Sequence, residues 1–171
     1  DRVVPVFYDH FGELRWILDL EGHPVLGDAK LGSGIYLGRN GNFILGDTRS
    51  GMLYEFSMTG DLIRDWNLPG YDFYNSIIEI NTGDLLIGAS KTDAATLGDQ
   101  VLHIARSQNQ ILNSWDLTQI LQPDRLITGE NERSWFDIDG ILYSSSEELI
   151  VTGRNQGVVK LTKEQELIWI L

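Results

Sequence analysis

Short apolar runs separated by turn-forming residues recur along the chain. Residues 34–38, 76–80 and 140–143 are apolar runs, and each is followed by a polar turn containing Asn, Gly, Thr or Ser and then by a second apolar run. Asn and Gly tolerate the positive φ angles of tight turns, and β-branched residues favour strands. The pattern therefore predicts a series of β-hairpins.

A second pattern marks the strands between these hairpins. Residues 7–18, 54–68, 102–117 and 159–171 each contain an apolar strand, a polar turn and a strand in which Trp is followed two residues later by Leu. Side chains two apart in a strand share a face, so each pair is expected to point toward one buried side. The pairs are Trp16/Leu18, Trp66/Leu68, Trp115/Leu117 and Trp169/Leu171. The two patterns together predict four-stranded antiparallel meanders.

Meanders that repeat about every 50 residues are typical of β-propeller blades. We therefore expect an all-β fold, a β-propeller of four-stranded antiparallel blades. The alternative is a β-sandwich, whose strands do not usually repeat as quartets with the same Trp on the last strand. The expected single propeller segment, residues 1–171, has a half blade at 1–20 and blades at about 31–69, 71–121 and 134–171.

Two stretches depart from the regular repeat. Residues 117–122 are the best candidate for a helix, which Pro123 would end, and residues 91–99 are interpreted as an insertion between the second and third strands of their blade. The count of about three and a half blades is lower than the 4–8 or so with which propellers close. We therefore expect missing blades of a longer polypeptide, or a second copy, to complete the ring.

Composition narrows the classes of partner. The 171 residues carry 13 Lys and Arg against 25 Asp and Glu, a net charge of −12, and the pI is about 4.5. Nucleic-acid binding needs a basic stripe, so DNA and RNA are not expected partners. No apolar run approaches the roughly 20 residues that span a bilayer. There is no Cys, no Gly-rich phosphate loop and no zinc pattern, so neither a cofactor nor a metal is expected.

Candidate site residues lie near the start of the predicted inner strands. Arg154 follows an apolar run, and its planar guanidinium suits a sulfate or phosphate group. Arg49 matches it one repeat earlier, and we expect it to bond only to its own turn. Asp137 and Asp139 alternate with Ile138, so they share one strand face. They suit a hard cation or a base with a partner, but we favour the alternative, a solvated rim or a turn cap.

These motifs, in their order along the chain, resemble the bacterial arylsulfotransferase (arylsulfate sulfotransferase) family. The resemblance rests on residues 66–70, 74–77, 81–86, 115–117, 134–139, 152–156 and 167–171. It implies a six-bladed propeller of which this chain is the middle portion, and a periplasmic or secreted location. It also implies transfer of a sulfuryl group from an aryl sulfate to a phenol, without a nucleotide sulfate donor.

The resemblance also implies roles for individual residues. Arg154 matches the family's arginine, whereas Asn75 and Asp137 stand where the family has histidines, and these three are the expected catalytic residues. The sulfuryl-carrying histidine of the family would lie beyond Leu171. The expected substrate-binding residues are Tyr74, Trp135, Asp139 and Asn155. Because Asn and Asp cannot supply the cationic charge of an imidazolium, a catalytically silent ligand- or protein-binding propeller is the alternative.

Overall fold

The computed structural model of the chain describes residues 4–19, 22–27, 29–121 and 134–171. Within these residues the strands form one two-stranded sheet and three four-stranded sheets. The two-stranded sheet consists of β1 (Val6–Tyr8) and β2 (Leu14–Ile17). The four-stranded sheets are β3 (Leu31–Leu37), β4 (Phe43–Asp47), β5 (Met52–Phe56) and β6 (Leu62–Asn67); β7 (Tyr71–Glu79), β8 (Leu85–Lys91), β9 (Gln100–Ala105) and β10 (Gln110–Asp116); and β11 (Ile138–Tyr143), β12 (Leu149–Gly153), β13 (Gly157–Leu161) and β14 (Leu167–Ile170).

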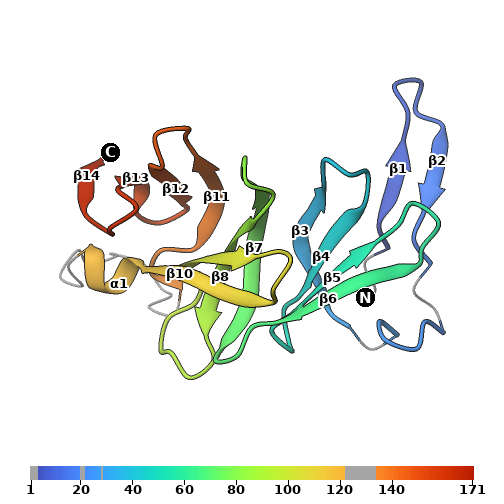
Figure 1. The fold of residues 1–171 in the computed structure, drawn as a ribbon, viewed down its shortest axis with the longest axis horizontal. Helices are drawn as coiled ribbons and strands as arrows, with labels where there is room; N and C mark the ends of the chain where they lie inside the picture. The colour runs from blue at the N-terminus through green and yellow to red at the C-terminus, as the bar shows by residue number, and fades with distance from the viewer. Residues whose placement is uncertain (1–3, 20–21, 28, 122–133) are drawn as a thin grey trace.

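Each four-stranded sheet is an antiparallel meander, with its strands hydrogen-bonded in chain order. In Figure 1 the sheets follow one another across the molecule in sequence order. The first strands of the sheets meet, because β7 contacts both β3 and β11. This arrangement confirms the predicted all-β fold of propeller blades and is not that of a sandwich.

The first strand of every four-stranded sheet is bulged. The pairing register shifts between Leu31 and Ile35 in β3, on both sides of Asn75 in β7, and between Ile138 and Gly140 in β11. A bulge breaks the regular alternation of side chains and aims one of them elsewhere. The candidate site residues Asn75 and Asp139 lie at two of these bulges.

The repeated Trp residues connect each sheet to the next. The indole Nε1–H of the last strand donates a hydrogen bond to a backbone carbonyl in the final hairpin turn of the following sheet. The three pairs are Trp16 to Met58 at 2.5 Å, Trp66 to Arg106 at 3.1 Å and Trp115 to Thr162 at 3.1 Å. A buried Trp usually finds such a partner for its N–H group, so the repeat fixes the spacing of neighbouring sheets.

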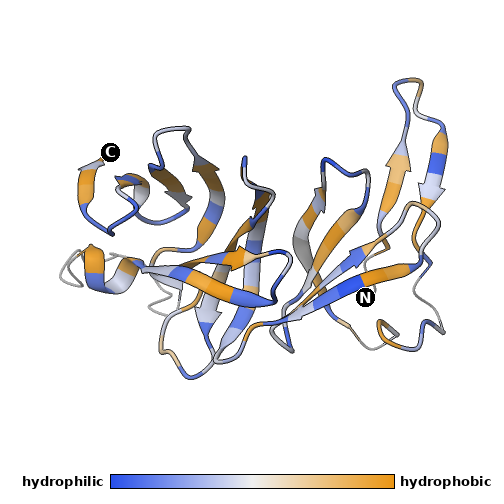
Figure 2. Ribbon diagram, in the orientation of Figure 1, coloured by the Kyte–Doolittle hydropathy of each residue, from blue (hydrophilic) through white to orange (hydrophobic). Residues whose placement is uncertain are grey.

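The Leu two residues after each Trp is buried in three repeats and exposed in the fourth. Leu18, Leu68 and Leu117 are at most 3% exposed, whereas Leu171 is 81% exposed. The expectation that every pair faces a buried side is therefore wrong for Trp169/Leu171, because among the described residues no sheet lies beyond β14. Figure 2 shows the general pattern, with apolar residues on the strands and polar residues at the hairpin turns.

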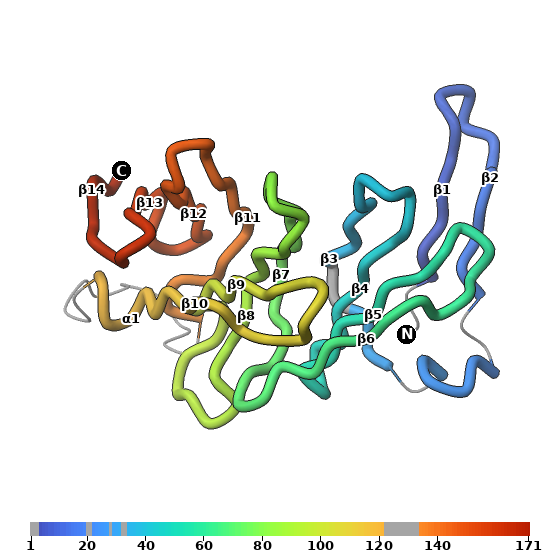
Figure 3. Tube along the Cα trace, viewed as in Figure 1, coloured from blue at the N-terminus to red at the C-terminus, as the bar shows by residue number. Residues whose placement is uncertain are grey.

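The two irregular stretches lie where the sequence predicted them. The helix α1 (Leu117–Ile120) begins after Asp116, whose side chain accepts hydrogen bonds from the backbone N–H groups of Thr118 and Gln119. Pro123, the predicted stop, lies outside the described residues. Residues 92–99 form the long loop between β8 and β9, the second and third strands of their sheet (Figure 3).

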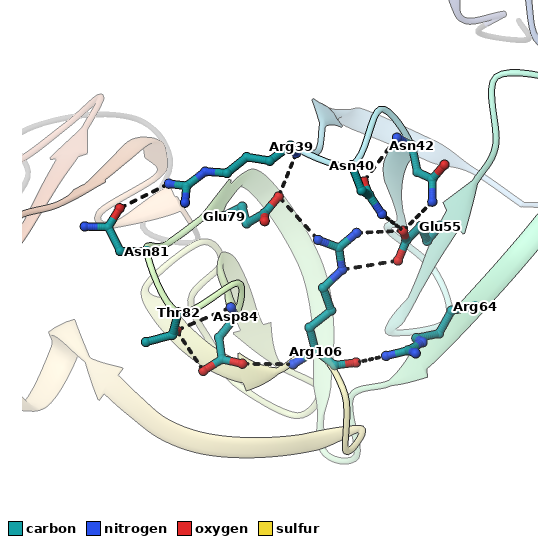
Figure 4. A network of polar contacts seen from close by, with 10 residues as sticks. All are labelled: Arg39, Asn40, Asn42, Glu55, Arg64, Glu79, Asn81, Thr82, Asp84 and Arg106. Atoms are coloured by element: carbon teal, nitrogen blue, oxygen red, sulfur yellow. Dashed lines mark hydrogen bonds and ion pairs between the residues drawn. The ribbon is translucent and has the colours of Figure 1, made fainter.

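A network of ion pairs at the hairpin turns joins the β3–β6 sheet to the β7–β10 sheet (Figure 4). The Arg106 guanidinium contacts Glu55 through two nitrogens, at 2.6 and 3.3 Å, and Glu79 through the third, at 3.3 Å. The side chains of both glutamates are buried, at 4% and 7% exposure. Neither the pairing nor its burial was predicted, because Glu55 and Arg106 lie 51 residues apart.

The Glu55 carboxylate has further donors. The side-chain amides of Asn40 and Asn42 each donate to its Oε1 at 2.7 Å. Burial by itself raises the pKa of Glu55, but the hydrogen bonds from Arg106, Asn42 and Asn40 outweigh burial and hold the pKa below its ordinary value. The network is therefore stable in its charged form, which is how buried carboxylates are tolerated.

Candidate functional site

Arg154 lies in the turn between β12 and β13, directly after the last residue of β12. Its backbone N–H donates to the carbonyl of Asp137 at 3.0 Å, which holds the turn against the start of β11. The turn approaches residues 136–137 so closely that the residue before Arg154 must be a glycine, since a Cβ on Gly153 would lie 2.5 Å from the ring of Phe136. The backbone therefore brings Arg154 directly beside Asp137.

The Arg154 guanidinium pairs with two carboxylates. Nη1 lies 3.3 Å from Asp137 Oδ2, and Nη2 lies 3.1 Å from Asp139 Oδ1. Both aspartates thus pair with the same cation. Asp137 has a left-handed backbone conformation (φ 59°), which Asp tolerates better than most residues. The charge of Asp137 and the hydrogen bond to Asp139 raise the pKa of Arg154. The Arg154 side chain is 65% exposed and Asp139 is 43% exposed, whereas Asp137 is buried.

Tyr74 reaches Asp137 from the neighbouring sheet. Its hydroxyl donates a hydrogen bond to Asp137 Oδ1. Its ring packs against the β8–β9 loop so closely that a Cβ on Gly98 would lie 2.3 Å from it. Burial, the hydrogen bond to Asp137 and the charge of that carboxylate together raise the pKa of Tyr74 to about 12. At neutral pH, therefore, Asp137 accepts from a protonated phenol on one side and faces a guanidinium on the other.

Asn75 and Ser76 tie the inner strands β7 and β11 together. Asn75 Nδ2 donates to the carbonyl of Ile138 at 3.4 Å, and Ser76 Oγ donates to the carbonyl of Asp139 at 2.9 Å. The Asn75 side chain also accepts from the backbone N–H of Ser76 at 2.8 Å. Asn75 therefore lies at the junction of two sheets, next to the Tyr74–Asp137 pair.

Trp135 and Asn155 support the segment that carries Asp137. Trp135 is 8% exposed and belongs to the apolar core cluster that also contains Phe136. Asn155 Nδ2 donates to the carbonyl of Ser134 at 2.5 Å. Both side chains hold residues 134–136 in place, and neither is among the residues that line the adjacent pocket.

A pocket of about 310 Å³ brings four of the predicted residues together. Its lining includes Tyr74, Asn75, Asp137 and Arg154, from two sheets, and a third sheet adds three more residues. These are Lys30, Leu31 and Thr48. The pocket thus lies where the starts of β3 and β11 meet the middle of β7.

The contribution of the β3–β6 sheet to the pocket was not predicted, and Arg49 is not the residue of that sheet that matches Arg154. Thr48 directly follows β4, just as Arg154 directly follows β12, so Thr48 and not Arg49 matches Arg154 in position. Arg49 is exposed, and its backbone N–H donates to the Asp47 carboxylate within its own turn. Aligning the repeats by strand ends, instead of by residue type, would have identified Thr48.

The charges around the pocket nearly balance. Arg154 is matched by Asp137 and Asp139, and Lys30 adds a second cation, for which the described residues provide no ion-pair partner. An incoming anion therefore meets two cations but competes with two carboxylates. Among the described residues, no group of three or more His, Cys, Asp or Glu side chains is arranged to hold a metal ion.

In the part of the chain that the structure describes, no helix has the length and apolar character required to cross a membrane.

Comparisons with known proteins agree with the predicted resemblance. The chain is 26% identical over 165 residues to the arylsulfate sulfotransferase AssT of Escherichia coli O6:H1, covering 69% of this chain and 27% of that protein. It is 26% identical over 215 residues to the AssT of Lelliottia amnigena, covering 95% of this chain and 35% of that protein. The chain therefore spans between about a quarter and a third of the length of these relatives.

The fold comparison and the family comparison lead to one assignment. The WD40 β-propeller domain of Doa1 superimposes with a TM-score of 0.56 at 14% identity, over 91% of this chain and 43% of that one, which supports the propeller architecture alone. The family model described as arylsulfotransferase (ASST) matches residues 2–171. The chain belongs to the arylsulfotransferase family.

Proposed function

We propose that this propeller segment is part of a sulfotransferase that moves a sulfuryl group from an aryl sulfate to a phenol. The observation that carries the proposal is the pocket lined by Arg154 and Lys30, from different sheets, and by Asp137, a carboxylate that already accepts a hydrogen bond from a phenol. Family membership over residues 2–171 supports the same reaction. The two curated relatives named above are arylsulfate sulfotransferases.

Arg154 is the proposed ligand for the sulfate oxygens. Its fork of N–H donors matches two oxygens of a sulfate group. Binding requires Asp139 to give up its contact, and because Asp139 is 43% exposed it exchanges readily into water. Lys30, which is exposed at the same pocket, adds a second favourable charge.

Asp137 is the proposed acceptor for the proton of the incoming phenol. It is buried, it is held by Arg154, and the Tyr74 hydroxyl occupies the position that a substrate hydroxyl would take. Asn75 holds the start of β11 in place through its hydrogen bond to the backbone carbonyl of Ile138. The family resemblance implies that a histidine carries the sulfuryl group, a role that we assign to none of the pocket residues.

A second candidate function is a binding propeller without catalysis. The observation that favours it is the pairing of Arg154 with two carboxylates. An aryl sulfate would have to displace both carboxylates from the Arg154 guanidinium before it could bind there. In such a module the same pocket would hold an aryl compound without transferring a group.

Sulfuryl transfer by the intact protein tests the two functions against each other. 4-Nitrophenyl sulfate is mixed with the protein, with and without phenol as acceptor, and nitrophenolate is measured by its absorbance. Acceptor-dependent release supports the enzyme, and we expect Arg154→Gln to slow it by about 10²-fold or more, as for loss of an oxyanion ligand. Arg49→Gln removes the same charge from an exposed turn and should leave the rate unchanged. Saturable binding without release supports the silent module.

We further propose that another blade covers the sheet edge at β14, and that the protein acts in the periplasm. The first proposal is supported by the 81% exposure of Leu171, whose counterparts Leu68 and Leu117 are buried by the following sheet. Either a longer polypeptide or a second copy would provide that blade, and the intact mass of the native protein with its mass in solution distinguishes them. The location rests on the family resemblance, and cell fractionation tests it.

A further inference from the structure

A second pocket lies at the opposite end of the inner strands from Arg154. Asp137 directly precedes β11, whereas Tyr143 is its last residue, next to the hairpin turn into β12. This pocket has a volume of about 280 Å³ and opens between the turns that follow β7 and β11, so we call it the turn-side pocket. Its lining includes Arg39, Ile78, Glu79, His103, Tyr143 and Glu147.

The carboxylates and the histidine of the turn-side pocket already have partners. Glu79 pairs with Arg106 and also accepts from the backbone N–H of Arg39 at 2.9 Å. Glu147 pairs with Lys163 at 2.7 Å. His103 lies 3.3 Å from Asp84, the residue that ends the turn after β7. Any ligand that binds these groups would have to break an existing contact.

Arg39 differs from the other charged residues of the pocket. Its side chain extends from the β3–β4 turn across to the β7–β8 turn, where Nη2 donates to Asn81 Oδ1 at 3.2 Å (Figure 4). Asn81 is neutral, and the described residues provide no carboxylate within ion-pair distance of the Arg39 guanidinium. A guanidinium with most of its donors unused is suited to an oxyanion.

One part of the pocket wall is apolar and aromatic. Ile78 and Tyr143 are half-buried and pack against the core cluster, which fixes their positions. Burial and the nearby charge of Glu147 raise the pKa of Tyr143, so its hydroxyl remains a donor at neutral pH. An aromatic ring stacked or edge-packed against such a wall gains contact area and a defined orientation.

We propose that the turn-side pocket binds a small aromatic anion, with its carboxylate or sulfate group on Arg39 and its ring against Tyr143 and Ile78. The site is separate from the Arg154 pocket, because the two share no lining residue and lie at opposite ends of β11. It is independent of the proposed sulfuryl transfer.

Calorimetric titration of the full chain with benzoate tests the proposal. We expect saturable binding whose dissociation constant rises about tenfold or more in Arg39→Gln, the effect of losing one charge-assisted hydrogen-bonding partner. Arg49→Gln is the matched control for net charge and should bind benzoate as the unaltered protein does. Each titration is repeated in an Arg154→Gln background, so that the other pocket does not contribute. Benzyl alcohol, which has the ring without the charge, should bind more weakly and without dependence on Arg39.

Two further arms complete the test. Tyr143→Leu keeps an apolar side chain but removes the ring and hydroxyl, and we expect it to weaken benzoate binding several-fold. Phenyl sulfate in place of benzoate, measured in the Arg154→Gln variant, shows whether a sulfate ester is accepted as well. Absence of saturable benzoate binding, equal affinity in Arg39→Gln, or loss of binding in Arg154→Gln instead would overturn the proposal.

Discussion

At the scale of single residues, the candidate site is organised around the buried carboxylate of Asp137. It lies between a phenol that donates to it and a guanidinium that pairs with it, and each of these groups comes from a different element. The sequence predicted that Tyr74, Asp137 and Arg154 belong to one site. It did not predict that Arg154 would be neutralised by Asp137 and Asp139, because ion pairing depends on the bulge and left-handed turn at the start of β11.

Replacing Asp137 by Asn tests this arrangement. Asp137 raises the pKa of Tyr74 through its hydrogen bond and its charge, so Asp137→Asn should lower that pKa from about 12 toward the ordinary tyrosine value. A spectrophotometric titration of phenolate measures it, with Tyr74→Phe identifying the signal of Tyr74 among the other tyrosines. An unchanged titration curve in Asp137→Asn would mean that Tyr74 and Asp137 do not interact.

At the scale of elements, two kinds of contact hold neighbouring sheets together. The Trp indoles repeat in sequence and were predicted as a buried stripe, and their carbonyl partners were found only in the structure. The Glu55–Arg106–Glu79 network does not recur in the other sheets, so the sequence repeats could not predict it. Strand order and hairpins depend on nearby residues and could be predicted, whereas contacts between blades depend on how the sheets pack.

The pH dependence of stability should report on the Glu55 network. Because the folded pKa of Glu55 is lowered, its stabilisation is present above its ordinary pKa of 4.5 and is lost as the pH falls toward the folded pKa. Glu55→Gln should therefore lower the free energy of unfolding by roughly 2–4 kcal/mol at neutral pH and flatten its decline in acid. Chemical denaturation at several pH values measures both effects.

Glu147→Gln is the matched control, since Glu147 pairs with Lys163 at an exposed turn. It should change neither quantity appreciably, as expected of surface ion pairs. Equal pH profiles for Glu55→Gln and the unaltered protein would contradict a stabilising role for the network.

At the scale of the whole molecule, the chain is a series of propeller blades with one pocket at each end of β11. The Trp spacing predicted the blades, and the candidate residues on β7, next to β11 and in the β12–β13 turn come together at one of these pockets. Lys30 and the turn-side pocket were not predicted, because neither has a sequence motif. Their positions follow from how three sheets pack, which the repeats alone do not specify.

The central claim is that Arg154 binds the sulfate group of an aryl sulfate in the pocket beside Asp137. The most direct test is the dissociation constant of phenyl sulfate for Arg154→Lys, measured in an Arg39→Gln background so that the turn-side pocket does not contribute. We predict binding about tenfold weaker than in Arg39→Gln alone, since Lys keeps the charge but loses the two-point fork. The same dissociation constant in both proteins would contradict the claim.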